Sequence, residues 1–172
     1  EPAALAPRHL PRLAMLALGL YCFVQLALPL RTHLYAGNVL WHEQGMRWSW
    51  RVMLRKKAGA ITYLVRLPSS GRVMYVAPQR YLTNYQEQEF SGQPDLILQL
   101  AHHIATDFGA RYHERVEVRV DAWVSLNGRP RARMIDPEVD LARVEDGLFA
   151  ASYILPAPTT VPVRLEPRHA AR

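Results

Sequence analysis

The most constraining feature of the sequence is an uncharged run of eighteen residues, Leu13 to Leu30, in which Gln25 is the only strongly polar side chain. A helix of that length covers about 27 Å, enough to cross the hydrocarbon core of a bilayer. A secretory signal peptide usually has a shorter apolar core that ends in small residues, whereas this run leads into Pro29 and Arg31. The sequence therefore predicts a retained transmembrane helix over residues 13–30 and a single-pass membrane location.

Two features of this run bear on its surroundings. Gly19 and Gln25 are residue types that support helix contacts in lipid, although a lone span tolerates both. The charge pattern does not decide the orientation, because Arg12 and Arg31 flank both ends. Membrane lipid is one expected partner, and other transmembrane helices or subunits are a second.

The segment that follows, residues 31–57, mixes aromatic and basic residues. From position 41 onward it holds three of the four tryptophans and both lysines. Trp41, Trp48 and Arg47 are residue types that settle at the water–lipid interface, where an aromatic ring with a polar edge and a cation with a wet head are both stable. We expect these three residues to face that interface. An interfacial anchor without chemistry is the simplest interpretation of the segment.

The basic balance of the chain does not indicate nucleic acid as a partner. The net charge is +6, but the arginines are spread along the whole chain and are not gathered into one run. The cations beside the apolar run are better matched to anionic lipid headgroups. Cys22 is the only cysteine, so the sequence contains neither an intramolecular disulfide nor a paired-cysteine zinc motif.

Beyond residue 57 the periodicity becomes strand-like. Alternation over residues 61–67, a Pro-Ser-Ser-Gly turn and residues 72–76 predict a first hairpin. Residues 116–127 alternate without a break, and Asn-Gly at 127–128 predicts a tight turn into a returning strand over 131–135. Between the hairpins we expect a short helix capped by Thr83 and a longer helix over 94–108 with one apolar stripe.

The predicted fold class is α+β, with one N-terminal transmembrane helix followed by a small soluble domain of β-hairpins and one or two packed helices. The expected organisation is a lead-in over residues 1–12, the transmembrane helix over 13–30, an interfacial junction over 31–57, the soluble domain over 58–155 and a proline-rich extended tail over 156–172.

Catalytic and metal motifs are not found. His42-Glu43 begins like the zinc pair of a metalloprotease helix, but the position of the second histidine is Met46. His102 and His103 are adjacent, about 100° apart on a helix, and so are poorly placed to share a metal. The residues alone predict no metal site and no catalytic residue.

Three stretches carry a family resemblance. They are Trp-Ser-Trp-Arg-Val-Met at 48–53, Pro-Asp-Leu-Ile-Leu-Gln-Leu-Ala at 94–101, and Val-Asp-Ala-Trp-Val-Ser-Leu-Asn-Gly-Arg at 120–129 with Ile-Asp-Pro-Glu-Val-Asp at 135–140. In this order and spacing they resemble the C-terminal part of the vitamin K-dependent γ-glutamyl carboxylase family, including its bacterial relatives with a horizontally transferred transmembrane domain.

The resemblance implies a membrane enzyme that oxidises vitamin K hydroquinone to generate a strong base. That base removes a γ-proton from a glutamate side chain, and the carbanion takes up CO₂. An apolar site at the membrane suits the quinone and excludes water that would quench the base. In the family, the lysine that acts on the hydroquinone belongs to an earlier membrane region. Neither Lys56 nor Lys57 matches it, so we expect this chain to lack the catalytic region and to hold no cofactor by itself.

The family's Ser-Trp-x-x-Met region lies near the glutamate and quinone pocket, which makes Trp50 and Met53 candidate substrate-binding residues here. Arg51, Arg55 and Lys57 then become candidates for holding a substrate carboxylate, the arginines through paired N–H groups and the lysine as a point charge. Contact with lipid headgroups is the alternative for these three cations.

Three functions remain open from the sequence, of which the third, a lipid-surface binding module, has no specific support beyond the basic junction. The first is the membrane-anchored C-terminal portion of a γ-carboxylase-like protein, from a family of carbon–carbon lyases, without the catalytic lysine region. The second is a non-catalytic single-span accessory subunit that braces a larger respiratory or photosynthetic membrane complex. The resemblance implies a lumenal or periplasmic soluble domain.

Overall fold

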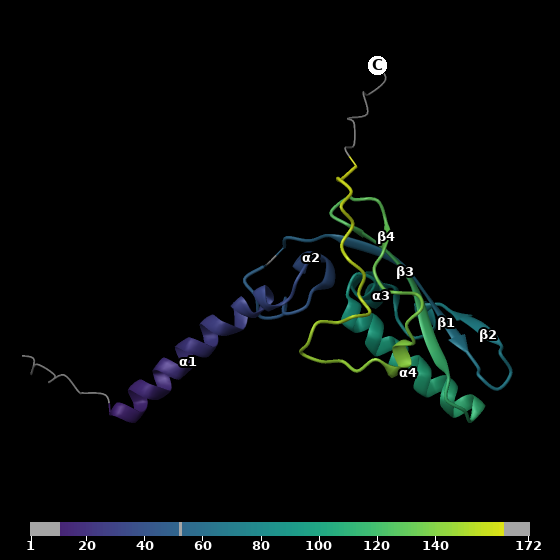
Figure 1. Cartoon of the computed structure of the whole chain (residues 1–172), viewed down its shortest axis with the longest axis horizontal. Helices are drawn as coiled ribbons and strands as arrows, with labels where there is room; N and C mark the ends of the chain where they lie inside the picture. Colours follow the sequence, from purple (N-terminus) through teal and green to yellow (C-terminus); the bar gives the residue numbers. More distant parts are fainter. Residues whose placement is uncertain (1–10, 52, 164–172) are drawn as a thin grey trace, which may run out of the picture.

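A computed structural model describes residues 11–51 and 53–163 of the chain (Figure 1). Its elements, in chain order, are α1 (Arg12–Leu30), the 3-10 helix η1 (Arg31–Leu34), α2 (Val39–His42), β1 (Lys57–Arg66), β2 (Val73–Val76), η2 (Pro78–Arg80), α3 (Asn84–Phe90), α4 (Pro94–Tyr112), β3 (Glu117–Leu126), β4 (Ala132–Arg133) and η3 (Leu141–Arg143). The predicted α+β class is confirmed.

Helix α1 extends away from the rest of the molecule as a separate rod (Figure 1). None of its side chains is buried, although most are apolar. Together with η1 it is long and apolar enough to cross a membrane. Pro29 lies in its last turn, immediately before the chain tightens into η1. Within residues 11–51 and 53–163, no part of the protein therefore covers the predicted membrane segment.

The sheet has the order β2-β1-β3-β4, and every neighbouring pair is antiparallel. Strands β1 and β3, which are separated in sequence by both α3 and α4, pair along ten residues from Lys57 opposite Leu126 to Arg66 opposite Glu117. The alternation of β3 puts its even-numbered residues, Val118 to Leu126, in the core. Lys57 thus stands at the end of the sheet nearest the junction.

Helix α4 supplies the other half of the core. Its apolar stripe includes Ile97, Ala101, Ile104 and Phe108, all buried. The hydroxyl of Tyr63 on β1 donates to the Ile97 carbonyl at 2.8 Å, which links the sheet to the helix. The helix runs past the predicted end, as far as Tyr112, where His113 closes it in the left-handed conformation with φ 55°.

Two of the predicted turn and cap signals are found as expected. Thr83 forms a capping box with Gln86 at the start of α3. Asn127 and Gly128 both have positive φ, at 50° and 76°, as the tight turn after β3 requires.

The returning strand is shorter than the predicted range 131–135. β4 covers only Ala132–Arg133, and Ile135 instead forms an isolated bridge with Ile154. The change of partner follows from Asp136-Pro137, since a proline has no N–H with which to continue a ladder. Met134 still donates its N–H to the Ala122 carbonyl.

The first residues of the predicted tail, 156–163, contain neither helix nor strand. They run beside the β3–β4 turn, where Arg129 Nε donates to the Thr160 carbonyl and the Val163 N–H donates to the Gly128 carbonyl. The rest of the predicted tail, and most of the predicted lead-in, lie outside the described residues.

Candidate functional site

A cleft of about 870 Å³ lies where the segment after α1 meets the soluble domain. Three segments line it: residues of the junction between Arg31 and Arg55, the residues Gln93 to Asp95 at the start of α4, and the loop 144–154. Because these segments are far apart in the sequence, the cleft is a product of the tertiary fold.

The junction wall of the cleft is built around the short helix α2. Asn38 caps this helix, its side-chain oxygen accepting the Leu40 N–H at 3.0 Å. Glu43 closes it in the left-handed conformation, with φ 59°, and its N–H donates to the Val39 carbonyl. Gly45 follows with φ 69°, packed so closely on Tyr35 that a Cβ would lie 2.8 Å from the ring. These two left-handed residues change the direction of the chain directly after α2.

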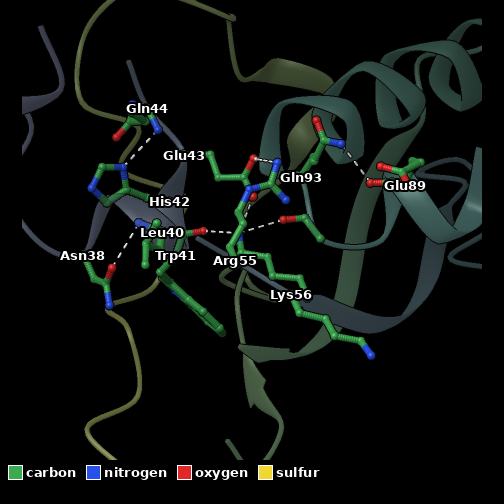
Figure 2. A network of polar contacts seen from close by, with 12 residues as sticks. Asn38, Leu40, Trp41, His42, Glu43, Gln44, Arg55, Lys56, Glu89 and Gln93 are labelled. Carbon is green, nitrogen blue, oxygen red and sulfur yellow. Dashed lines mark hydrogen bonds and ion pairs between the residues drawn. The ribbon is translucent and has the colours of Figure 1, made fainter. Parts of the chain in front are cut away.

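Behind this wall is a buried network of charges (Figure 2). Lys57 Nζ donates to the Trp41 carbonyl at 2.5 Å, to Glu43 Oε1 at 2.7 Å and to the Gly92 carbonyl at 2.8 Å. Arg55 binds the other oxygen of the same carboxylate at 2.8 Å. The Lys57 side chain is 2% exposed and that of Glu43 is 10% exposed. The network joins the junction, β1 and the α3–α4 turn.

Burial dominates the electrostatics of this network. It lowers the pKa of Lys57 to about 8, because an ammonium group loses its hydration there. Burial also raises the pKa of Glu43, while the charges of Lys57 and Arg55 act in the opposite direction. With three acceptors around the ammonium and two cations beside the carboxylate, both groups are charged at neutral pH.

A glycine makes room for the lysine. A Cβ built on Gly92 would lie 2.7 Å from Lys57 Cβ and 3.0 Å from Lys57 Cδ, well inside van der Waals contact. Only a residue without a side chain lets the α3–α4 turn approach β1 this closely and present its carbonyl to Nζ.

The other arginines of the cleft differ in how fully they are paired. Arg47 forms an ion pair with Asp95 at the start of α4. Arg31 donates to the carbonyls of Gly45 at 3.3 Å and Arg47 at 3.0 Å. The half-buried Arg51 also lines the cleft, and within the described part of the chain its guanidinium makes no hydrogen bond or ion pair.

His42 adds a neutral donor to the same wall. Its Nδ1 accepts the Gln44 N–H at 3.1 Å, so Nδ1 carries no proton (Figure 2). Burial, followed by the Lys57 charge, lowers the pKa of His42, and the ring is therefore neutral with its proton on Nε2. Among the described residues this buried Nε2–H has no partner.

The structure places the predicted site residues in three different environments. Arg51 and Arg55 line the cleft as candidate carboxylate-binding residues, although Arg55 is already paired with Glu43. Trp50 and Met53 are 68% and 97% exposed and are not part of the cleft lining. Lys57 is fully enclosed by its own three acceptors. It holds an internal carboxylate, which corrects its interpretation as a ligand-binding cation.

The predicted interface residues also separate. Trp48 is 77% exposed, which allows the expected contact with lipid. Arg47 is exposed but paired with Asp95. Trp41 is only 1% exposed, packs in the core and donates its Nε1–H to the Leu155 carbonyl at 2.8 Å. Its interpretation as an interface residue is therefore wrong, because α2 turns this ring inward.

Several cleft residues were not predicted from the sequence. Arg31, Tyr35, Glu43 and Asp95 contribute to it, as does the loop 144–154, and no local pattern marks them as one site. In the described ranges 11–51 and 53–163 no group of three His, Cys, Asp or Glu side chains is arranged to hold a metal ion.

A family profile described as "Vitamin K-dependent gamma-carboxylase, lumenal domain" matches residues 10–160. The chain belongs to this family. Comparisons with curated proteins and with solved structures gave no match.

Two of the three stretches that resemble the γ-carboxylase family meet at the cleft. The first, residues 48–53, contributes Arg51, and the second, which opens α4, contributes Pro94 and Asp95. The third forms β3, its turn and the segment leading to Asp140, whose carboxylate accepts the Val118 N–H at 2.8 Å. In this domain the third stretch forms part of the sheet, and the cleft gathers residues of the other two.

Proposed function

We propose that this chain is the membrane-anchored, substrate-binding lumenal portion of a γ-carboxylase-like protein, and that its cleft holds the carboxylate of a glutamate side chain. The observation that carries the proposal is Arg51, a cation of the cleft that has no partner among the described residues. A guanidinium in a partly enclosed site is a strong and directional carboxylate ligand.

The neighbouring ion pairs support this role for Arg51. Arg47 is paired with Asp95, and Arg55 shares the Glu43 carboxylate with Lys57, so both arginines already have partners within the protein. Glu145 and Asp146 in the loop 144–154 are exposed acids that also line the cleft. They repel the carboxylate of the ligand and so favour its binding beside the junction.

The proposed role is binding and not the carboxylation chemistry itself. Trp50 and Met53, the residues expected beside the quinone, lie exposed outside the cleft. Lys57 is held by three acceptors, and Lys56 points away from the network (Figure 2). We therefore propose that the quinone and its catalytic lysine belong to a membrane region beside α1.

The localisation that accompanies this function is a single membrane crossing by α1, with the domain on the lumenal or periplasmic side. The support is the uncovered apolar helix and the lumenal description of the matching family.

The binding proposal is tested with a fluorescent glutamate-containing peptide and the full chain in detergent micelles. Fluorescence anisotropy should report binding of this peptide and not of the same peptide with glutamine in place of glutamate. Arg51→Gln should weaken binding about tenfold, the value of one charge-assisted hydrogen-bonded contact.

Arg72→Gln is the matched control, because Arg72 is an exposed arginine in the β1–β2 turn, at the end of β1 opposite Lys57. It should leave the affinity unchanged. Equal binding of both peptides, or equal losses in the two variants, would contradict the proposed site.

A second candidate is the non-catalytic accessory subunit that braces a larger membrane complex. The observation that favours it is the use of Lys57, Glu43 and Arg55 to lock the junction to the sheet, which makes a rigid connection between α1 and the domain. Purification from native membranes in mild detergent tests it. Co-purification in fixed proportion with other membrane subunits supports bracing, and a free monomer argues against it.

A further inference from the structure

We propose that the loop around Leu148 and Phe149 is a second membrane contact, which enters the lipid surface beside the end of α1. The contact surface is the membrane-proximal patch, defined as Leu34, Trp48, Leu148 and Phe149. The occupant is the bilayer itself. The proposal rests on α1 crossing the membrane, and it concerns how the soluble domain is oriented on that membrane.

The apolar side chains of this patch are unusually exposed. Leu148 is 78% exposed and Phe149 is 90% exposed, and they are consecutive residues at the tip of the loop. Leu34, at the end of η1, is 82% exposed, and Trp48 is 77% exposed. Large apolar side chains gathered in this way on a protein surface mark a contact with a partner or a membrane.

Hydrogen bonds hold the loop against the residues that follow α1. The Tyr35 hydroxyl donates to the Leu148 carbonyl at 2.6 Å, and Gln44 Nε2 donates to the Phe149 carbonyl at 3.0 Å. Both tethers use the backbone of the apolar residues and leave their side chains outward. Tyr35 is only five residues after the last residue of α1, so the loop tip is anchored close to where a spanning helix leaves the hydrocarbon.

Trp48 is brought to the same region by a different contact. Arg31, the first residue after α1, donates to the carbonyl of Arg47, the residue before Trp48. Trp48 itself has φ 68°, a left-handed conformation that a bulky residue adopts at some cost in strain. In Figure 1 the yellow-green loop extends from the domain on the side where α1 departs. The patch therefore continues the apolar surface of α1.

The charges of the loop limit how deep the contact goes. Glu145 and Asp146 are exposed and come just before Gly147, so they stay in water while the next two residues enter the interface. They also oppose an anionic surface, so the contact depends on apolar insertion and forms on neutral lipid. In this orientation the cleft, whose lining includes Arg31 and the loop itself, opens at the membrane surface.

Site-specific fluorescence tests the contact in the full chain, reconstituted into phosphatidylcholine nanodiscs. The environment-sensitive dye NBD is attached at Cys22 in the natural chain, or at Gly147→Cys or Ser70→Cys in a Cys22→Ala background. Gly147 suits labelling because nothing lies within 4 Å of a Cβ placed there, and Ser70 is an exposed control in the β1–β2 turn. Quenching by nitroxide-labelled lipid is measured for each.

The label at position 147 should be quenched by the lipid nitroxide several-fold more than the label at position 70. That excess should disappear in the Leu148→Ser and Phe149→Ser double variant, whose folding is checked by circular dichroism. If the label at position 22 is quenched but the label at position 147 is quenched no more than the label at position 70, the loop contact is overturned and the membrane anchor is not. Failure of quenching at 22 overturns both, and quenching at 147 that survives the double variant overturns the role of these two side chains.

Discussion

Removal of the Glu43 charge is the sharpest test of the buried network. Glu43→Gln leaves the Lys57 ammonium, on a side chain only 2% exposed, with two neutral carbonyl acceptors and no counter-charge. Breaking a buried pair from one side usually costs about 3–5 kcal/mol. The loss has a ceiling, because Lys57 can give up its proton. At pH 7 that costs about 1.4 kcal/mol, because the pKa of folded Lys57 is already lowered to about 8, and the loss of the charged partner of Arg55 adds to it.

The matched comparison is Lys57→Met. It leaves Glu43 paired with Arg55 at 2.8 Å, and its main penalty is the loss of donors to the Trp41 and Gly92 carbonyls. We expect a smaller loss, about 1–3 kcal/mol. The double variant should cost less than the sum of the two single changes, because the methionine removes the charge that Glu43→Gln leaves uncompensated.

Urea unfolding in detergent micelles, followed by the fluorescence of the buried Trp41, measures these changes in free energy. Glu138→Gln serves as the surface control. Glu138 is 80% exposed in its pair with Arg119, and its loss should change stability by no more than about 1 kcal/mol. If Glu43→Gln costs no more than Glu138→Gln, the buried network does not hold the junction to the sheet and the reasoning fails.

Three further outcomes follow from the same structure. The unfolding free energy should rise by about 2 kcal/mol between pH 8 and 10, since in that window the unfolded lysine still carries the proton that folded Lys57, with its pKa lowered to about 8, has lost. Above pH 10 the unfolding free energy should fall again, because burial raises the pKa of Tyr63 and Tyr153, which keep their protons when the unfolded tyrosines lose theirs. A urea-unfolding free energy that stays constant from pH 8 to 10 would contradict the lowered pKa of Lys57. Gly92→Ala should destabilise by about 1–3 kcal/mol through its overlap with Lys57, whereas Gly147→Ala, with open space around it, should be close to neutral in the same urea titration. Trp41→Phe should cost about 1–3 kcal/mol by leaving the Leu155 carbonyl unpaired, and a thermal melt with no shift would argue against that buried hydrogen bond.

Local sequence patterns determined most of the elements. The uncharged run predicted α1, the alternation over 116–127 predicted β3, and the stripe beginning at Pro94 predicted α4. Thr83 and Asn127-Gly128 indicated a cap and a turn that the structure contains. These features are readable because helix and strand periods, caps and turns depend on residues a few positions apart. The family resemblance, carried by three short stretches, is likewise present in the sequence, and the match over residues 10–160 confirms it.

Only the tertiary structure decided what the aromatic and basic residues of the junction do. Trp41 and Trp48 are the same residue type seven positions apart, yet one is in the core and the other on the surface. Arg51 lines a cleft, whereas Lys57 is enclosed by groups from the junction, β1 and the α3–α4 turn. Composition places such residues near a membrane but does not say which way the backbone turns them. That direction depends on α2, on the positive φ of Glu43 and Gly45, and on contacts with residues about 50 to 100 positions away in the chain.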